Sequence, residues 1–508
     1  MLARLSFVIL SLVFAAPCYA DEREHPNILF VISDDQSYEY ASANGSKFVH
    51  TPNFDRLAKE GVRFTHAFSL SPGCAPSRAG LLTGRYPWEL REAGTHASKF
   101  PADLKTYPDL LAAAGYTIGS AGKGWGPGNW QITGRPHNPA GPATGGDKKV
   151  NKKSAKVPAV PQPEVKGKLS PLAEKFAQFL AARPQDKHFC YWVGAAEPHR
   201  SFVKEAGLKA GKNLEDAVVP AFLPDVPEVR SDLLDYAVEI ETFDKQLGEL
   251  LQLLEENGLY KNTLIVVTSD NGLPFPRGKA LNYDSGTHMP LVISWPAEVP
   301  GGRTVDDLVS LVDLAPTYLE VAGVARPENF RGRSLLPLLL SDKSGLVEPA
   351  RTGVYSSRER HSSSRYENWT YPIRSLRTRD YLYVRNFRPE RWPAGDPVDS
   401  DGTPAFTDID ASPTKSLILE RRDDPTFKPF FELAVAKRPA EELFDVNADP
   451  ANLKNLAADP KYADVLKRLR TEMEATLTAT GDPRMTSDAD VWESYPRYSA
   501  IREFPKPE

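Results

Sequence analysis

Short runs of apolar residues, each ending in polar or acidic residues, recur through the first half of the chain. Residues 27–33 read Asn-Ile-Leu-Phe-Val-Ile-Ser, and similar runs occupy residues 189–195 and 263–268. Because the apolar positions do not alternate with polar ones, these runs are typical of strands buried on both faces of a parallel sheet. The pattern predicts three strands of such a sheet.

Helical patterns separate these runs. Thr51 and Pro52 begin a stretch that we expect to be helical through Lys59, with the threonine hydroxyl as its cap and the proline at its first position. Residues 231–257 form a long amphipathic helical pattern. The alternation predicts an α/β fold, a large mixed, mostly parallel sheet flanked by helices. Ligands in such folds bind beyond the carboxyl ends of the strands.

The pattern changes in two places. Residues 141–168 are rich in Gly, Pro and Lys, which predicts an exposed loop. In the last third of the chain the apolar segments are shorter, such as residues 381–387, and a helical pattern covers residues 462–477. We therefore expect a catalytic domain over residues 21–345 and a smaller C-terminal α+β subdomain over residues 346–508.

The first 20 residues resemble a secretory signal peptide. Arg4 precedes an apolar run over residues 5–16, and residues 18–20, Cys-Tyr-Ala, offer small side chains at a cleavage site. An uncleaved membrane anchor is the alternative, but the run is shorter than the roughly 20 residues that a spanning helix needs. We expect an exported protein, periplasmic or secreted, with no membrane span in the mature chain.

Composition and charge narrow the function. Hydrophobic residues make up 41% and charged residues 25% of the 508 positions, as in ordinary globular proteins. The signal peptide takes away one of the 62 basic residues and none of the 67 acidic ones, which leaves a net charge of about −6. A general surface for nucleic acids is therefore not expected, and an anionic substrate must be met by a local cluster of positive charge. Cys74 and Cys190 remain, too few for a disulfide framework, although one bridge is possible in principle.

Acidic and amide side chains follow two of the predicted strands. Asp34 and Asp35 come directly after the first strand, and Asp270 and Asn271 follow the strand at residues 263–268. Either pair alone is also typical of a solvated turn at a strand end. Together they form an all-oxygen set suited to a hard divalent cation such as Ca²⁺.

Cys74 opens residues 74–85, Cys-Ala-Pro-Ser-Arg-Ala-Gly-Leu-Leu-Thr-Gly-Arg, in which we expect a helix from about Pro76. The free N–H groups and the positive dipole at a helix start attract anions and lower the pKa of a thiol. We therefore interpret Cys74 as a nucleophile. A buried structural cysteine is the alternative, and it fits poorly with the flanking Gly, Pro, Ser and Arg residues.

Residues 74–78, Cys-Ala-Pro-Ser-Arg, and residues 81–85, Leu-Leu-Thr-Gly-Arg, resemble the signature of the formylglycine-dependent type I sulfatases of the alkaline phosphatase superfamily. The resemblance implies that a formylglycine-generating maturation enzyme oxidises Cys74 to an aldehyde, whose hydrate attacks the sulfur of a sulfate ester. Because the hydrate carries two hydroxyl groups on one carbon, the second can expel the sulfate that the first has captured. An alkaline-phosphatase-like fold is implied as well.

The same resemblance implies a role for each candidate residue. One Ca²⁺ is bound by the formylglycine oxygen and four other ligands, the full set being Asp34, Asp35, Cys74, Asp270 and Asn271. Arg78 steadies the formylglycine and the metal, Lys123 and Lys279 bind the sulfate, and His199 is the general acid for the leaving group.

One position departs from the family pattern. Trp125 stands where the family usually has a histidine after the lysine at position 123, which leaves open which group deprotonates the hydrate. A lone lysine in a Gly-rich loop such as Lys123 is more often solvated, so its role depends on the resemblance. His199 follows the strand at residues 189–195 and falls on the same edge as the metal set, with a structural histidine as the alternative.

Within the family, several segments are most similar to heparan N-sulfatases (sulfamidases). They are residues 270–279, Asp-Asn-Gly-Leu-Pro-Phe-Pro-Arg-Gly-Lys, with 197–200, 371–374 and 442–445. This similarity implies a sulfated carbohydrate substrate, N-sulfoglucosamine of the heparan type or a related O-sulfated sugar. His361, in a polar stretch with several Ser and Arg residues, is a candidate sugar contact, and an ordinary polar loop is equally consistent.

Two other functions stay open on the sequence. A phosphonate or phosphate monoester hydrolase of the same superfamily can share the residue 74–78 signature. If Cys74 is not converted, the chain could instead be a non-catalytic binder of sulfated glycans. The sequence does not indicate an oligomeric state.

Overall fold

The computed structural model describes residues 25–146, 168–486 and 489–507. The expected signal peptide and residues 147–167 of the expected loop lie outside these ranges. In the described part of the chain, no helix is both long and apolar enough to cross a membrane.

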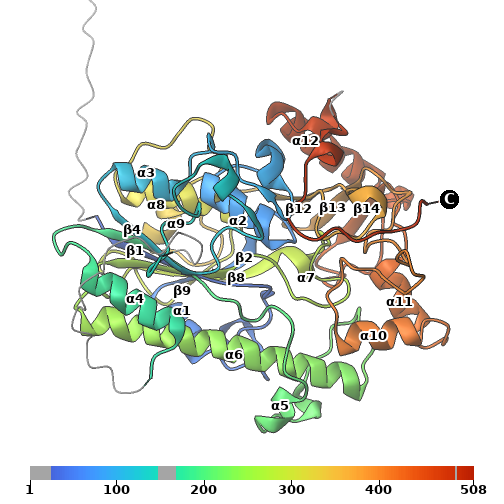
Figure 1. Cartoon of the computed structure of the whole chain (residues 1–508), viewed down its shortest axis with the longest axis horizontal. Helices are drawn as coiled ribbons and strands as arrows, with labels where there is room; N and C mark the ends of the chain where they lie inside the picture. The colour runs from blue at the N-terminus through green and yellow to red at the C-terminus, as the bar shows by residue number, and fades with distance from the viewer. Residues whose placement is uncertain (1–24, 147–167, 487–488, 508) are drawn as a thin grey trace, which may run out of the picture.

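A central sheet of eight strands forms the middle layer of the larger part of the structure (Figure 1). Its strands are β1 (Asn27–Ser33), β2 (Val62–Phe68), β4 (Thr117–Gly122), β6 (Phe189–Gly194), β7 (Thr263–Ser269), β8 (His288–Ser294), β9 (Arg303–Val305) and β10 (Val309–Ser310). They lie in the order β10-β2-β8-β7-β1-β6-β4, and β9 pairs with β2. The pairings of β8 with β2 and β7 are antiparallel and the others are parallel. The predicted mixed, mostly parallel sheet is confirmed.

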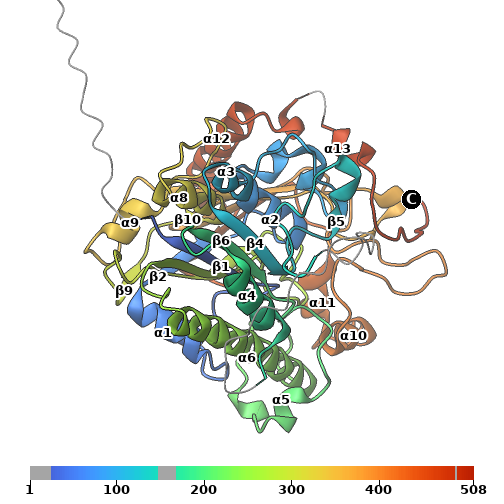
Figure 2. The ribbon, with the colours of Figure 1, turned by 60° about the vertical axis from the view of Figure 1, so that its left-hand side comes forward.

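Helices cover both faces of this sheet. They are α1 (Pro52–Glu60), α2 (Cys74–Thr83), α3 (Tyr107–Ala113), α4 (Pro171–Ala182), α6 (Pro227–Glu256), α8 (Leu314–Val321) and α9 (Leu336–Leu340). Figure 1 shows α2, α3, α8 and α9 on one side and α1, α4 and α6 on the other, and Figure 2 shows the same layers from a turned view. All seven residues of β1 are buried. Ile28 and Phe30 pack into the core under the first group of helices, and Leu29 and Val31 into the core under the second.

The start of α1 differs from the prediction. Thr51 occupies the cap position, but its hydroxyl makes no capping hydrogen bond to the helix. Instead, the Asp244 carboxylate on α6 accepts hydrogen bonds from the backbone N–H groups of Asn53 (3.0 Å) and Phe54 (2.8 Å). The cap therefore comes from a residue about 190 positions away, which local sequence rules do not address.

The other predicted elements are present with shifted ends. α6 begins at Pro227, four residues before the predicted start, because proline is well suited to the first turn of a helix. The predicted strand at 381–387 is β13 (Tyr381–Asn386), and the predicted helix at 462–477 is α12 (Ala463–Ala479).

The C-terminal part of the chain forms a second layered unit, on the right of Figure 1. Its antiparallel sheet has the order β11-β12-β13-β14, with β11 at Gly353–Arg358, β12 at Ile373–Thr378 and β14 at Glu441–Asp445. α12 packs on this sheet through Leu469, Met473 and Leu477. Two more helices, α10 (Pro413–Glu420) and α11 (Lys428–Val435), lie near α6. The smaller α+β architecture is confirmed, while the boundary between residues 345 and 346 stays a prediction.

The remaining described elements are short. They are α5 (Ala206–Lys209), α7 (Asp284–Thr287), α13 (Val491–Ser494), β3 (Ser98–Lys99) and β5 (Gly128–Asn129). Four neighbouring strands of the large sheet are parallel to one another: β4, β6, β1 and β7. Their carboxyl ends therefore meet at one edge of this sheet. The polar residues that follow them are brought together there.

Candidate active site

Cys74 is the first residue of α2 and lies against this edge. Gly73 precedes the helix, and the Ser77 N–H donates to the Gly73 carbonyl (3.2 Å). The helix begins at Cys74 rather than near Pro76, and Cys74 is only 1% exposed. Both Cys74 and Cys190 are free, so no bridge joins them.

The expected low thiol pKa at Cys74 is wrong. Burial raises the pKa of this thiol, and the favourable charge of Lys123 does not compensate. Desolvation dominates because the side chain has almost no access to water. The unmodified side chain is therefore a protonated thiol at neutral pH.

The acidic side chains predicted for a metal converge on Cys74. One ligand atom from each of Asp34, Cys74 and Asp270 lies within 4.8 Å of the other two. The Asp35 N–H donates to Asp270 Oδ1 (3.2 Å), and Asn271 Nδ2 donates to Asp35 Oδ1 (2.7 Å). The four oxygen-bearing residues are all at most 2% exposed. Side chains from the ends of β1 and β7 and from α2 thus form one buried cluster.

The donor set fits a hard cation. Asp34 Oδ1 and Asn271 Oδ1 are buried, and neither has a hydrogen-bond partner among the described residues. A buried carboxylate oxygen without a partner is costly, and a divalent cation would satisfy both atoms. Asp34, Asp35, Asp270 and Asn271 offer the oxygen ligands that Ca²⁺ or Mg²⁺ prefers, and the number of carboxylates favours a doubly charged ion.

Arg78 holds the cluster from the α2 side. Its Nε donates to Asp270 Oδ2 (2.7 Å), and its Nη1 donates to the backbone carbonyls of Lys123 (2.6 Å) and Gly124 (3.2 Å). Its Nη2 lies 3.8 Å from Asp34 Oδ1. The guanidinium is fully buried, so it links the metal cluster to the loop after β4.

Two lysines place positive charge beside the carboxylates. Lys123 Nζ lies 2.5 Å from Asp34 Oδ2, and Lys279 Nζ lies 2.7 Å from Asp35 Oδ2. Burial alone would lower the pKa of each lysine, but the adjacent aspartate raises it above the usual value, so both are cationic. Lys123, predicted either as a sulfate ligand or as a solvated residue, is a member of the site.

The carboxylates respond differently to the same environment. Burial favours a raised pKa for Asp34, but Lys123 and then Arg78 outweigh it and hold this pKa well below the usual range. For Asp270, burial dominates over Arg78 and raises the pKa to about 6. A divalent cation would favour the ionised form of both, as metal ions do for their ligands.

His199 faces an open cavity next to the cluster. Its side chain is 36% exposed, and Nε2 lies 3.8 Å from Asp35 Oδ2. Nδ1 lies 2.5 Å from the Arg200 carbonyl, which assigns the Nδ1 proton to that contact and leaves Nε2 toward the cavity. The cavity has a volume of about 440 Å³, and its lining includes Asp34, Lys123 and His199.

Trp125 does not point into this site. It is 2% exposed and belongs to the hydrophobic core with Phe100, whose ring centroid is 5.2 Å away. The position that the family usually gives to a histidine therefore contributes packing here.

His361 reaches the site from the C-terminal unit. A Cβ atom added to Gly73 would lie 3.1 Å from His361 Cδ2, so the imidazole sits against the residue before Cys74. Its Nδ1 is 3.6 Å from Asp408 Oδ1, and neither ring nitrogen has a hydrogen-bond partner among the described residues. The candidate residue is thus adjacent to the nucleophile position.

The arginines around His361 are not available to a ligand. Arg358 pairs with Asp408 Oδ2, and Arg365 Nη2 lies 2.8 Å from the same oxygen. Both arginines are at most 3% exposed. Arg358 and Arg365 are therefore engaged by Asp408 within the protein, while the prediction for His361 as a sugar contact stays a prediction.

A match to a family model decides the family. The model described as Sulfatase matches residues 26–324, more than half of the chain. This protein belongs to the sulfatase family. A second model, described as N-sulphoglucosamine sulphohydrolase, C-terminal, matches residues 277–392 of this sulfatase.

Similar proteins support the same assignment. Human N-sulphoglucosamine sulphohydrolase is 30% identical, over 92% of this sulfatase and 93% of the human protein. An ulvan-active sulfatase of Formosa agariphila is 29% identical, over 93% of this chain and 77% of its own. A solved structure described as a complex with its substrate D-glucosamine-2-N,6-O-disulfate has a TM-score of 0.64 at 21% identity, over 90% and 99% of the two chains. The predicted alkaline-phosphatase-like fold is confirmed.

Sequence reasoning missed one charged residue of the site. Asp410, in the loop before α10, lies 3.3 Å from Lys279 Nζ through Oδ2. It follows no predicted strand and belongs to no recognised motif, so no local signal identifies it. Its place in the site depends on the packing of the C-terminal unit against the large sheet.

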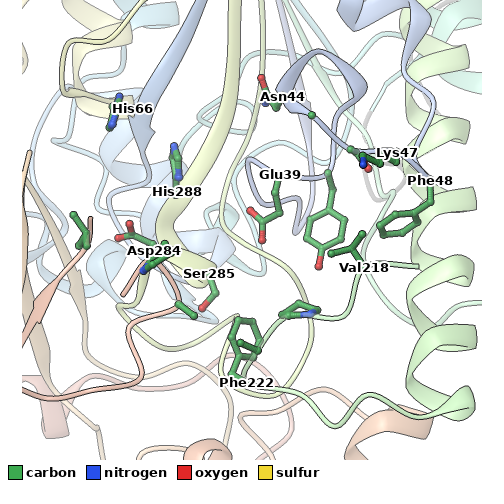
Figure 3. Close-up of a pocket in the computed structure, with 18 of the residues that line it drawn as sticks. Glu39, Asn44, Lys47, Phe48, His66, Val218, Phe222, Asp284, Ser285 and His288 are labelled. Carbon is green, nitrogen blue, oxygen red and sulfur yellow. The ribbon is translucent and has the colours of Figure 1, made fainter. Parts of the chain in front are cut away.

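A larger cavity lies elsewhere. It has a volume of about 730 Å³ and is shown in Figure 3, where Glu39 projects into it between Asp284 and Val218. Neither Cys74 nor any member of the metal cluster lines it. Cavity size therefore does not identify the reactive site in this sulfatase.

Proposed function

We propose that this sulfatase removes sulfate from a carbohydrate, with the N-sulfate of a heparan-type glucosamine as the principal substrate and a related O-sulfated sugar as the alternative. The observation that carries the proposal is the convergence of Cys74, three aspartates and three cationic side chains at one sheet edge. The match of residues 277–392 to the sulphohydrolase C-terminal model and the similarity to the human protein favour the N-sulfate.

Formylglycine at position 74 and one Ca²⁺ are part of this proposal. The hydrated aldehyde would supply the nucleophile, and the cation would supply charge for a sulfate oxygen. The cation would be held by Asp34, Asp35, Asp270 and Asn271, as Asp34 Oδ1 and Asn271 Oδ1, unpartnered among the described residues, suggest. A formylglycine-generating enzyme is the expected maturation partner.

The chain's own residues provide the rest of the chemistry. Lys123 and Lys279 present ammonium groups to the sulfate oxygens, and Arg78 keeps the Lys123 loop in place. His199 Nε2 faces the cavity, and in the doubly protonated imidazolium form it would donate its proton to the leaving nitrogen or oxygen, leaving a neutral ring with the proton on Nδ1. His361, next to Gly73, would contact the bound sulfate or sugar.

A substrate panel tests the proposal. Glucosamine derivatives that carry a single N-, 2-O- or 6-O-sulfate would be compared with aryl sulfate and aryl phosphate. We expect N-desulfation to have the highest kcat/KM. A preference for aryl phosphate over every sulfate would contradict the proposal and favour a phosphate monoester hydrolase.

The nucleophile is tested by Cys74→Ala. This change should abolish turnover and preserve the fold, because Cys74 is a free thiol and an alanine fits the same space. Mass spectrometry of the tryptic peptide 64–78 should show a loss of about 18 Da where cysteine has become formylglycine. Full activity of the alanine variant would refute the mechanism.

Two further expectations belong to the proposal. The sequence of residues 1–20 supports export to the periplasm or the cell exterior, which an N-terminal sequencing of the mature protein would test. We also expect a domain boundary between residues 345 and 346. Limited proteolysis would test it, because cleavage should concentrate near this position.

A further inference from the structure

Asp410 places a carboxylate beside the groups that receive an anion. Its Oδ2 is 3.3 Å from Lys279 Nζ, and its side chain is 25% exposed. One oxygen of Asp35, one oxygen of Asp410 and one ring nitrogen of His199 lie within 4.8 Å of one another. Asp410 is therefore next to the histidine that would protonate the leaving group.

Lys279 does not need Asp410 for charge neutralisation. Asp35 already pairs with it at 2.7 Å and is fully buried, whereas Asp410 is longer in distance and more exposed. A second carboxylate at this position weakens the attraction for sulfate unless it binds something else. A partly exposed carboxylate at this position is free to accept a hydrogen bond from the substrate.

The charges of the site set a limit on the ligand. The four carboxylates are those of Asp34, Asp35, Asp270 and Asp410, and the three cations are Arg78, Lys123 and Lys279. A divalent cation would leave one net positive charge, which matches one singly charged sulfate group. A second sulfate next to the first would face the negative charge of Asp410.

Asp410 acts as an acceptor only. Burial would raise its pKa, but Lys279 outweighs burial and lowers the pKa to about 2. An ionised carboxylate accepts hydrogen bonds and cannot donate them. It therefore distinguishes a hydroxyl or N–H group from an ether, a hydrogen atom or a sulfate.

We propose that Asp410 is a specificity-determining residue that accepts a hydrogen bond from the hydroxyl group on the sugar carbon next to the sulfated one. The inference rests on the proposed function. The N-sulfate of glucosamine is on C2, between C1 and C3, and in a glycoside C1 carries the glycosidic oxygen, so the free neighbouring group is the 3-hydroxyl. The same carboxylate rejects a sugar that carries a second sulfate at that carbon. The selected substrate class is thus a sulfated sugar with a free neighbouring hydroxyl.

A purely structural role makes a different prediction. If Asp410 only positions Lys279, its loss weakens the hold on sulfate itself and affects every substrate by the same factor. If Asp410 accepts a hydrogen bond from the hydroxyl group, its replacement lowers kcat/KM only for substrates that carry this hydroxyl. A cycle that changes both the residue and the substrate separates these two roles.

The experiment compares wild-type protein with Asp410→Asn. The substrates are glucosamine N-sulfate, its 3-deoxy analogue, the N,3-O-disulfate and an aryl sulfate. Asp423→Asn is the control, because this side chain is 97% exposed, lies between α10 and α11, and loses the same charge. Thermal unfolding of each variant checks that the fold is retained.

We expect the wild type to lose about 10- to 100-fold in kcat/KM when the 3-hydroxyl is removed, as for a hydrogen bond to a charged group. For the Asp410→Asn variant, removal of the 3-hydroxyl should lower kcat/KM by less than about threefold. This variant should also discriminate less than the wild type against the N,3-O-disulfate. Asp423→Asn should resemble the wild type on all four substrates.

The outcomes distinguish the two levels of the proposal. An equal loss for Asp410→Asn on all four substrates, aryl sulfate included, would overturn the role of Asp410 and leave the N-sulfatase proposal intact. A wild-type protein that cleaves aryl sulfate but not glucosamine N-sulfate would overturn the N-sulfatase proposal, and the inference on Asp410 with it.

Discussion

Replacement of Arg78 by lysine tests how the active site is held together. The guanidinium donates to Asp270 Oδ2 and to the carbonyls of Lys123 and Gly124 at once. A lysine keeps the charge, but its single ammonium group cannot span both Asp270 and the two carbonyls. Arg78→Lys therefore removes contacts rather than charge.

The loss can be sized from the contacts. Hydrogen bonds to charged groups contribute about 1.5–3 kcal/mol each, and at least one to a backbone carbonyl is lost without access to water. We expect the free energy of unfolding to fall by about 3 kcal/mol. The Lys123 loop keeps two anchors, because Trp192 Nε1 donates to the Lys123 carbonyl at 2.9 Å and the Lys123 N–H donates to the Gly194 carbonyl at 2.7 Å. A looser loop displaces Lys123 Nζ, and kcat/KM should fall about 100-fold.

Urea unfolding followed by tryptophan fluorescence and kcat/KM for aryl sulfate are the two measurements. Arg135→Lys is a matched control. Arg135 is 6% exposed in its side chain, contacts both Asp109 oxygens (2.7 and 2.9 Å) and donates to the Leu104 carbonyl (3.0 Å). The Arg135→Lys variant should have a lower free energy of unfolding than the wild type but a kcat/KM within about threefold of it. If Arg78→Lys matched the wild type in both measurements, the proposed anchoring role would be wrong.

Three further outcomes are expected. Removal of divalent ions with EDTA should abolish activity, and added Ca²⁺ should restore it and raise the unfolding free energy by about 2.7 kcal/mol at a concentration of 100 times its Kd; full activity in a metal-free sample would contradict a metal site. His199→Asn should lower kcat/KM for glucosamine N-sulfate by about 100-fold or more, and less for an aryl sulfate whose leaving group needs no proton; equal losses would exclude a general acid. Burial raises the pKa of Asp244 from 3.8 to about 6. The free energy of unfolding should therefore fall by about 3 kcal/mol as the pH rises from about 4 to above 6, because the folded state holds this proton more tightly than the unfolded state. Urea unfolding across this range should show a smaller decline for Asp244→Asn, and equal declines would contradict the assignment.

Features that depend on a few neighbouring residues could be predicted from the sequence. The apolar run at residues 27–33 is a strand because both of its faces are covered. The helix expected from about Pro76 is present as α2, although it begins two residues earlier, at Cys74. The choice of oxygen ligands at Asp34 and Asp270 follows from the chemistry of the side chains. The end of each strand in a parallel sheet then specifies the edge where these ligands meet.

Features that depend on burial or on distant partners could not. The pKa of Cys74 is set by how completely the surrounding chain excludes water, and a helix start alone predicts the opposite direction. The cap of α1 is Asp244 rather than Thr51, because the nearest carboxylate in space is on another helix. The arginines at 358 and 365 are occupied by Asp408, so their exposure could not be judged from the loop sequence.

The amino-acid sequence by itself determined the class of chemistry, since a short motif and a set of ligand types carry it without reference to distant residues. Which other side chains lie beside these motif residues could be seen only in the tertiary structure. It brought Asp410 from the C-terminal unit to Lys279 and His199, and it turned Trp125 into the core. The physical reason is that reactivity resides in single residues, whereas proximity, desolvation and charge balance are properties of the packed chain.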